Sequence, residues 1–417
     1  MRTLNPLSKN NIIHDMAMFC LVLWLTVNYA YENYIGHTIY ASLSLYLFLG
    51  IGAFWLLVKG SYTITRNYFF VSMILLLVLI LFSFFYIPES ISALASRWSY
   101  RYFTNIVLVF IIINLVRDDK DMEFVFKGFV AGGLLLAFLF YQFYGSDVFE
   151  VAEMAEDPNS RLGWQFGNVN LLAQKCTFSV IIAFYYTQYA KSKFNRAICA
   201  FIAVFVFSVC LFSGSKKAIF VVAFSVIYLI LSKSVMRRGG SKMRAFISIA
   251  IIVVLMIVVI YNVPYFDIIR QRLDSFFSIF TGKQVSVSDM RRISYIRRGL
   301  SQFLQKPFFG NGVNYSEYMF GTYSHNNYVE MLLNFGIVGF IIYYYPYFAG
   351  IKRTVMYKDT KGRRKRALFL SIMIGILITD IGVVTYYDRN IAILMCLVSK
   401  YYSDLPYEQV ESNERGK

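Results

Sequence analysis

The stretch Tyr68-FFVSMILLLVLILFSFFY-Ile87 decides the fold, because its twenty residues include no charged side chain. A helix needs roughly 20 apolar residues to cross the hydrocarbon core of a bilayer. Residues 68-87 are therefore predicted to form a membrane-spanning helix, and the rest of the chain has to be interpreted with lipid as its solvent.

Apolar runs of the same kind recur along the chain, although several are shorter. They lie near 12-30, 38-58, 68-87, 102-116, 123-144, 168-190, 197-213, 216-232, 245-262, 327-349, 367-386 and 388-401. Helices at these positions would carry the chain across a bilayer about twelve times. The sequence thus predicts an all-α integral membrane protein.

The composition agrees with this fold class. Of the 417 residues, 58% are hydrophobic and 18% aromatic, and the mean hydropathy of +0.53 excludes a soluble domain with a wetted surface. The net charge of +17 does not indicate nucleic-acid binding, because the Lys and Arg residues stand in short runs between the apolar stretches. The five cysteines lie inside apolar runs without disulfide or metal-ligand spacing, so we expect no metal site and no cofactor.

The basic residues predict which side of the membrane each loop faces, since cytoplasmic loops carry the excess of Lys and Arg. With the N-terminus inside, the short basic loops between the first nine spans that contain Lys59, Arg117, Lys193 and Arg237 are inside, and so is the densest run at 352-366. The acidic segment 147-157 and the longest connection, 263-326, then fall outside. We expect one polytopic domain over 1-417 with both termini in the cytoplasm, including a C-terminal tail at 402-417. The N-terminus shows no signal-peptide cleavage pattern, so the first apolar run is expected to be retained.

The connection at 263-326 is far longer than usual, and such loops are generally functional. It ends in Lys306-PFFGN-Gly312, and Ser324-HNNYVEMLLNFGIV-Gly339 follows. Here the sequence resembles the O-antigen ligase and polymerase family, the membrane glycosyltransferases that join lipid-linked oligosaccharides outside the cytoplasm. The positions that match the two motifs of this family are Pro307, Gly310, Gly312, His325, Asn326, Glu330, Gly336 and Gly339.

Further elements of the family pattern appear upstream in the same order. Ser213-GSKK-Ala218 resembles S-G-S-R-x-A, Arg292-ISYIRRG-Leu300 resembles R-x-x-x-W-x-x-A-L, and Arg161 with Asn168-V-Asn170 resembles the element before the sixth span. The resemblance covers about residues 160-340. Two positions depart from it, because Lys216 replaces the arginine and Ile296 replaces the tryptophan. Lysine keeps the charge but loses the bidentate grip on a phosphate.

A physical argument stands beside the resemblance. Under the predicted topology, the helices that begin near Lys216 and His325 both start at the outer face, and helix N-termini favour anions. Lys217, Arg291 and Arg292 would lie on the same face and complete a cradle for a diphosphate. The bilayer contains a natural ligand for such a cradle, a sugar linked to polyprenyl diphosphate.

The resemblance, together with the positions of the cations, predicts roles for individual residues. His325 and Arg292 are the predicted catalytic residues, with His325 deprotonating or orienting the acceptor hydroxyl and Arg292 binding phosphate. The predicted diphosphate ligands are Lys216, Lys217, Arg291, Lys175 and Arg101, and the predicted supporting residues are Asn326, Glu330, Arg161 and Asn170. Glu330 follows His325 by five residues, which favours orienting a neighbour over acting as the base.

Several of these residues also have a purely structural interpretation. Lys216 and Lys175 could snorkel to the interface, and Arg292 could anchor the loop to lipid headgroups. Lys175 is nevertheless a candidate by default, since it is a cation inside a membrane span. His14 and His37 have no motif around them and are interpreted as structural.

The resemblance implies a GT-C-like, metal-independent glycosyltransferase in a bacterial cell membrane, with an extracytoplasmic site and inversion at the anomeric carbon. We favour a polymerase that joins undecaprenyl-diphosphate-linked repeat units of a capsule or O-antigen. The alternatives are a ligase that transfers finished glycan to lipid A core or another acceptor, a flippase or exporter of lipid-linked oligosaccharide, and a non-enzymatic scaffold. The implied partners are the lipid-linked donor, a glycan acceptor and membrane lipids, with a chain-length regulator and a flippase as further candidates.

Overall fold

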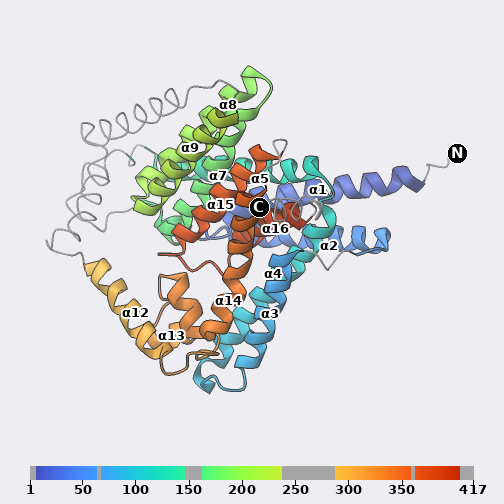
Figure 1. The fold of residues 1–417 in the computed structure, drawn as a ribbon. Helices are drawn as coiled ribbons and strands as arrows, with labels where there is room; N and C mark the ends of the chain where they lie inside the picture. The colour runs from blue at the N-terminus through green and yellow to red at the C-terminus, as the bar shows by residue number, and fades with distance from the viewer. Residues whose placement is uncertain are drawn as a thin grey trace, which may run out of the picture. The chain divides into compact units, whose positions relative to one another are not determined.

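The structure is a computed structural model that describes residues 6-62, 67-145, 148, 162-236, 287-357 and 362-403. Within these ranges every regular element is a helix (Figure 1). The predicted all-helical fold is therefore confirmed for this part of the chain.

Most helices coincide with the predicted apolar runs. These are α1 (Pro6–Tyr31), α2 (Thr38–Lys59), α3 (Tyr68–Ser83), α4 (Ser92–Leu115), α5 (Asp119–Tyr144), α7 (Val169–Tyr189), α8 (Lys193–Phe212), α9 (Lys216–Met236), α14 (Asn327–Met356), α15 (Arg363–Thr379) and α16 (Arg389–Ser403). Two short 3-10 helices are η1 (Glu89–Ile91) and η2 (Trp164–Phe166). The predicted span at 245-262 lies outside the described residues.

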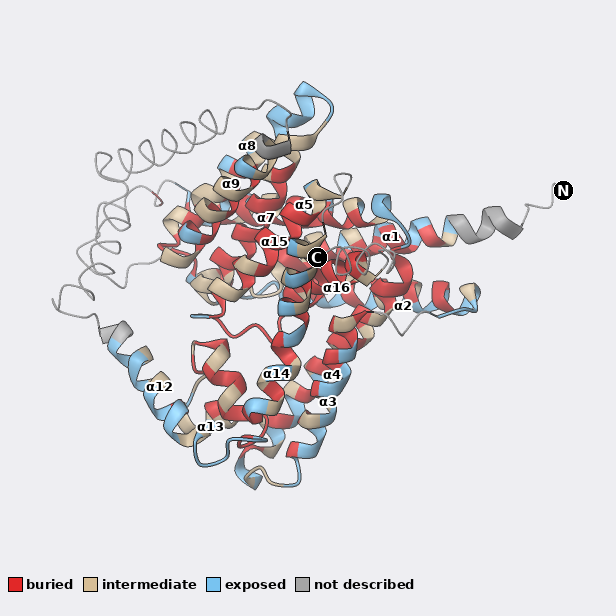
Figure 2. Cartoon of the chain, in the orientation of Figure 1, coloured by how far each residue is buried: buried red, intermediate tan, exposed pale blue. Residues whose placement is uncertain are grey.

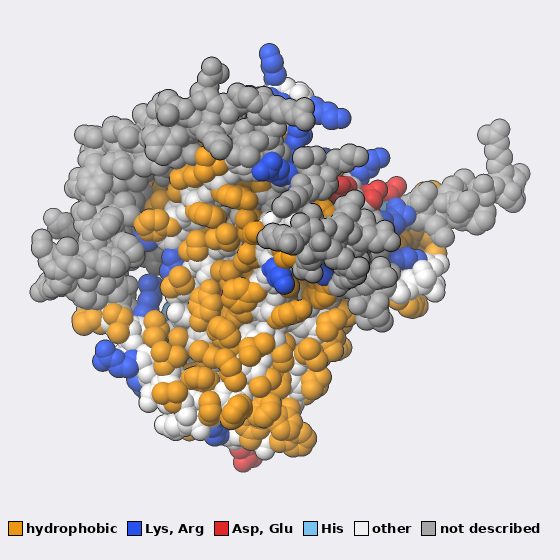
Figure 3. All heavy atoms as spheres, viewed as in Figure 1, with side chains coloured by type: hydrophobic (Ala, Val, Ile, Leu, Met, Phe, Trp, Pro, Cys, Tyr) orange, Lys and Arg blue, Asp and Glu red, His pale blue; other side chains and the backbone are white. Residues whose placement is uncertain are grey.

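Among the described residues, seven helices are long and apolar enough to cross a membrane, namely α1, α2, α4, α5, α7, α8 and α14. Helix α3 is apolar but only 16 residues long. The chain is therefore a multi-pass membrane protein, while the crossing number of about twelve stays a prediction. Hydrophobic side chains cover much of the described surface in Figure 3, as lipid contact requires.

Several predicted helix ends differ from the structure: α4 begins at Ser92 rather than near residue 102, and α14 ends at Met356 rather than near residue 349. Two other helices end early. Helix α3 ends at Ser83 rather than near residue 87, and the Ser83 hydroxyl accepts a hydrogen bond from the Val313 backbone N–H at 3.2 Å. Helix α15 ends at Thr379 rather than near residue 386. The carboxylate of the next residue, Asp380, accepts hydrogen bonds from Thr385 and Tyr344 at 2.6 and 2.8 Å. Side-chain hydrogen bonds, which hydropathy does not register, therefore lie at the ends of both helices.

The chain divides into two compact units. The first comprises Met1–Ile51, Asp118–Val285 and Asp359–Thr379, so that its described part holds α1, most of α2, α5, α7, α8, α9 and α15. In it α1 packs on α5, α7 packs on α8, and α9 packs on α15. Helix α7 is largely buried among its neighbours (Figure 2).

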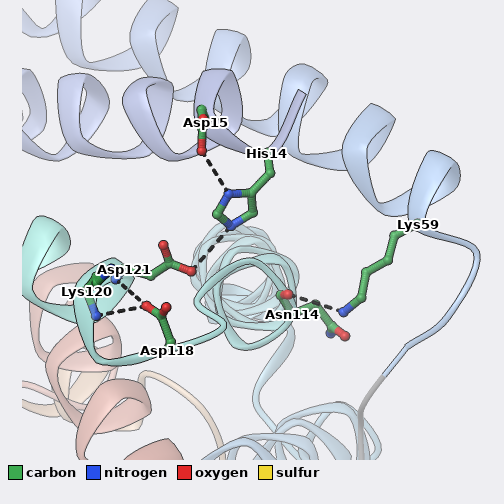
Figure 4. A network of polar contacts seen from close by, with 7 residues as sticks. All are labelled: His14, Asp15, Lys59, Asn114, Asp118, Lys120 and Asp121. Atoms are coloured by element: carbon green, nitrogen blue, oxygen red, sulfur yellow. Dashed lines mark hydrogen bonds and ion pairs between the residues drawn. The ribbon is translucent and has the colours of Figure 1, made fainter. Parts of the chain in front are cut away.

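Local polar contacts fix the start of α5 in this unit. The Asp118 carboxylate caps the helix by accepting from the N–H groups of Lys120 and Asp121 at 2.8 and 2.9 Å. The buried His14 ring of α1 lies 3.4 Å from the Asp121 carboxylate (Figure 4). His14 thus connects α1 to α5, in agreement with its structural interpretation.

The second unit comprises Gly52–Arg117, Ser286–Lys358 and Asp380–Lys417. It contains α3, α4, α14 and α16, together with α12 (Val287–Phe303) and α13 (Tyr315–Phe320). Helices α12 and α13 lie within the long connection that the sequence presents as a loop. Helix α14 packs against both α3 and α12, and most residues of α12 are exposed (Figure 2).

Helix α14 is broken at Gly336, whose φ of 63° lies outside the helical region. The loop that carries the proline-glycine motif inserts at this break: the N–H of Ile337 donates to the Pro307 carbonyl at 2.8 Å. A Cβ on Gly336 would come within 2.2 Å of the Phe308 oxygen, and a Cβ on Gly310 within 2.5 Å of the Asn334 backbone. Because neither glycine has a Cβ, the backbone of the loop can pack directly against the backbone of α14 at this break.

Candidate active site around His325

His325 directly precedes the first turn of α14 and has a φ of 59°, which is unusual for a non-glycine residue. The cap of the helix holds it there. The Asn326 side chain accepts from the Val329 N–H at 3.1 Å, and the Ser324 hydroxyl donates to the Asn326 carbonyl at 2.8 Å. A left-handed conformation of this kind persists only where surrounding bonds impose it, and such residues concentrate at functional sites.

Glu330 is buried one turn into α14 and organises the segment before His325. Its carboxylate accepts hydrogen bonds from the Ser324 backbone N–H at 2.8 Å, from the Asn334 amide at 3.2 Å and from the Ser316 hydroxyl. The first of these bonds fixes the residue that directly precedes His325. This geometry supports the predicted role of Glu330 in orienting a neighbour.

Changing Glu330 to glutamine is expected to destabilise the site and slow glycan transfer. The carboxamide keeps only one accepting oxygen, so its NH2 group would face either the Ser324 N–H or the Asn334 amide group, and both of these are donors. Leaving a buried donor without an acceptor costs about 1–3 kcal/mol of unfolding free energy. Thermal unfolding in detergent and a transfer assay measure both effects, with Glu317→Gln on the neighbouring α13 as the matched control. Unchanged stability and transfer in Glu330→Gln would contradict the positioning role.

Aromatic rings surround the half-buried His325. The Tyr323 ring centroid lies 4.2 Å from that of His325, and the Tyr295 ring lies at 6.3 Å and almost parallel, with 4° between the planes. Tyr295 also stacks on Phe320 at 4.7 Å. Tyr295 directly precedes Ile296, the position at which the tryptophan of the family pattern is missing. Sequence reasoning overlooked Tyr295, although it follows Arg292 by three residues and therefore lies near it on the surface of α12.

Arg292 belongs to the same neighbourhood. Burial raises the pKa of the Tyr323 hydroxyl, and the nearby positive charge of Arg292 opposes this rise. Arg292 is half-buried on α12, whereas Arg291 is exposed. Of the two adjacent arginines, Arg292 is thus the one whose charge reaches the ring beside His325.

Arg101 of α4 lies against two further rings of this unit. Its guanidinium carbon lies 5.5 Å from the Trp98 ring centroid and 5.7 Å from that of Tyr387. Burial raises the pKa of the Tyr387 hydroxyl, the negative charge of Glu330 raises it further, and Arg101 opposes the rise. The charges of Arg101 and Glu330 therefore both affect the pKa of the Tyr387 hydroxyl. Arg101 thus belongs to the same part of the second unit as Glu330.

The other predicted ligands belong to the first unit. Lys216 and Lys217 are the first two residues of α9 and are half-buried, and Asn170 donates its backbone N–H to the Asn168 side chain at 2.8 Å. Arg161 lies outside the described residues. That these residues meet Arg292 and His325 on one face stays a prediction.

Lys175 is buried in α7 and has an acidic partner, Glu32, directly after the end of α1. Its ammonium group lies 3.1 Å from the Glu32 carboxylate and 3.2 Å from the Tyr29 carbonyl oxygen. Both side chains of the ion pair are almost inaccessible, at 7% and 10% exposed. This pair gives Lys175 a structural role, and its role as a diphosphate ligand stays a prediction.

Changing Lys175 to methionine should destabilise the protein strongly, because the Glu32 charge would remain buried without its partner. Removing one member of a buried ion pair costs about 3–5 kcal/mol. The double variant Glu32→Gln, Lys175→Met should recover most of this loss, since no buried charge remains. Melting temperatures in detergent measure the effect, and a single variant as stable as the wild type would show that the pair contributes little.

Within the described ranges, no three His, Cys, Asp or Glu residues come together as metal ligands. The absence of a metal cofactor stays a prediction. What the second unit brings together is an imidazole, two arginines and a set of tyrosines at the start of an apolar helix. Such a set can accept a proton and stabilise an anion, the two tasks of group transfer from a diphosphate.

The fold and the site thus define a helical, multi-pass membrane protein with a basic and aromatic site at the start of a long apolar helix. Residues 201-344 match a family model described as O-antigen ligase. The matched range includes Lys216, Arg292, His325 and Glu330. Members of the family are enzymes that transfer lipid-linked glycans of the bacterial envelope. A comparison with curated proteins gave no match.

Proposed function

We propose that the chain is a polymerase of capsule or O-antigen that joins undecaprenyl-diphosphate-linked repeat units and releases polyprenyl diphosphate. The observation that carries the proposal is the site around Tyr323. The His325 ring lies 4.2 Å from the Tyr323 ring, and the positive charge of Arg292 opposes the rise that burial causes in the pKa of the Tyr323 hydroxyl. A general base beside a cation suits the displacement of a diphosphate by a hydroxyl.

In the proposed reaction, His325 accepts the proton of an acceptor hydroxyl while the hydroxyl oxygen forms a bond to the anomeric carbon of the donor. The bond between that carbon and the diphosphate oxygen breaks, and the lipid diphosphate leaves with the electron pair. Direct displacement inverts the anomeric carbon. Arg292 stabilises the charge on the leaving group through charge-assisted hydrogen bonds, and Lys216, Lys217, Arg291 and Arg101 complete the proposed cradle.

The proposal includes a topology. About twelve spans in one polytopic, GT-C-like domain put both termini in the cytoplasm and the site on the outer face of the cell membrane. The helix starts at Lys216 and Asn327 support an anion site there, since the positive end of a helix dipole attracts a diphosphate. The chain-length regulator and the flippase remain proposed partners.

A ligase is the second candidate, because the family match applies equally to ligases and polymerases. Both would use the same donor, so donor-site residues do not separate them. The basis for preferring a polymerase is the pair Lys216-Lys217, where the family pattern has arginine followed by a variable residue.

Cells that lack the chain distinguish the candidates by the lipid-linked glycan that they accumulate. Loss of a polymerase should leave single repeat units on the lipid at the outer face. Loss of a ligase should leave long lipid-linked polymer instead, and loss of a flippase should leave single repeats confined to the cytoplasmic face. Normal glycan lengths in such cells would contradict all three functions.

A further inference from the structure

Two aromatic rings from distant parts of the second unit meet near its catalytic candidates. Trp98 lies in the second turn of α4, and Tyr387 lies in the segment between α15 and α16. Their ring centroids are 4.2 Å apart, with 46° between the planes. Both rings are half-buried, whereas the adjacent Tyr102 and Tyr386 are fully buried. Part of the Trp98 and Tyr387 side chains is therefore exposed, while the neighbouring Tyr102 and Tyr386 are buried.

The backbone that carries Tyr387 is held firmly. The Asn105 amide donates to the Tyr387 carbonyl at 2.9 Å, and the Arg389 side chain donates to the Asn105 oxygen at 3.2 Å. On the other side, the Asn327 side-chain oxygen accepts from the N–H of Thr385 at 3.0 Å. Rings that are fixed in advance lose little conformational entropy when a ligand binds.

The ring pair lies in the electrostatic surroundings of the His325 site. Arg101 lies within 6 Å of both ring centroids, at 5.5 and 5.7 Å. Besides burial, Glu330 and Tyr323 both raise the pKa of the Tyr387 hydroxyl. The Tyr323 ring in turn contacts the His325 ring. The Asn327 side-chain oxygen accepts from the N–H groups of both Thr385 and Tyr386 at 3.0 and 3.3 Å, so the segment that carries Tyr387 lies against the start of α14, two residues after His325.

We propose that Trp98 and Tyr387 form a sugar-binding subsite that stacks against a pyranose ring of the repeat-unit glycan. A pyranose presents C–H groups on its face and hydroxyls around its edge. The negative faces of aromatic rings attract such C–H groups and remove their apolar area from water. Arg101, beside both rings, supplies hydrogen-bond donors for hydroxyl or carboxylate groups at the edge of the sugar. This inference rests on the proposed glycan transfer and specifies how its substrate is recognised.

Binding of free glycan tests the subsite without requiring catalysis. The probe is the oligosaccharide released by mild acid from lipid-linked repeat units of the source cell, titrated calorimetrically into the purified full-length protein in detergent. Trp98→Ala and Tyr387→Ala should each weaken its binding about tenfold, since aromatic anchors dominate such contacts. Trp98→Phe keeps a ring and should bind almost as the wild type does, which separates ring loss from misfolding.

Trp164 provides the matched control, because its side chain is 58% exposed and it belongs to the first unit. Trp164→Ala should bind the oligosaccharide with wild-type affinity. The subsite is overturned if Trp98→Ala and Tyr387→Ala also bind normally, or if the wild type does not bind the oligosaccharide. If instead ring loss weakens binding but the wild type transfers no glycan, the subsite stands and the polymerase proposal fails.

Kinetics then distinguish the two possible sources of the sugar ring. If the ring belongs to the acceptor, Trp98→Ala should raise KM for a soluble acceptor at saturating lipid-linked donor. If it belongs to the donor, KM for the donor should rise at saturating acceptor. Unchanged KM for both substrates would overturn the subsite.

Discussion

Replacing His325 by alanine should lower the rate of glycan transfer at least about a hundredfold, because the reaction loses the group that accepts the hydroxyl proton. The cap of α14 uses Ser324 and Asn326 rather than the imidazole, so the variant should retain its melting temperature. The release of polyprenyl diphosphate by purified protein measures the rate.

His37 is the matched control for this variant. It is exposed between α1 and α2, and its ring lies 4.6 Å from that of Tyr34. His37→Ala should transfer glycan at the wild-type rate. If His325→Ala is as fast as the wild type, the catalytic assignment is wrong.

Replacing Arg292 by alanine is expected to slow transfer by about 10²–10³-fold, the usual loss when a group that stabilises transition-state charge is removed. Arg292→Lys should restore only a small part of the rate, since an ammonium group does not bind a phosphate with two parallel hydrogen bonds. The rate of diphosphate release, measured at saturating acceptor, tests both variants.

Arg297 controls for the loss of a positive charge from α12, because it is exposed on the same helix. Arg297→Ala should leave the rate close to that of the wild type. If both alanine variants lose activity equally, the effect comes from the net charge of the helix. If neither loses activity, Arg292 only anchors the helix.

Much of the fold could be predicted from hydropathy, because a bilayer requires long apolar helices and tolerates few alternatives. Most described helices start close to the predicted positions, as α2 and α9 illustrate, whereas α4 starts ten residues before the predicted run at 102-116. Hydropathy failed where polar contacts decide the structure. Asp380 and its hydrogen bonds lie where α15 ends early. Helix α12 contains so many charged residues that hydropathy assigns it to a loop.

The candidate site was predictable where a local motif encodes it. The histidine motif indicated His325 and Glu330 together, and the contact between Glu330 and the Ser324 N–H explains why the two residues occur at this spacing. Trp98 and Tyr387 were not predictable, since they belong to separate segments that only the tertiary fold brings together. Nor did the sequence indicate Glu32 as the partner of Lys175.

The central claim is that this chain itself forms glycosidic bonds at the expense of a lipid diphosphate. The most direct measurement is to incubate the purified protein in detergent with undecaprenyl-diphosphate-linked repeat units and to analyse the products by mass spectrometry. The account predicts a ladder of lipid-linked products that differ by one repeat unit, with one lipid diphosphate released for each bond formed. Recovery of only unreacted single repeats, under conditions where the protein remains folded, would contradict it.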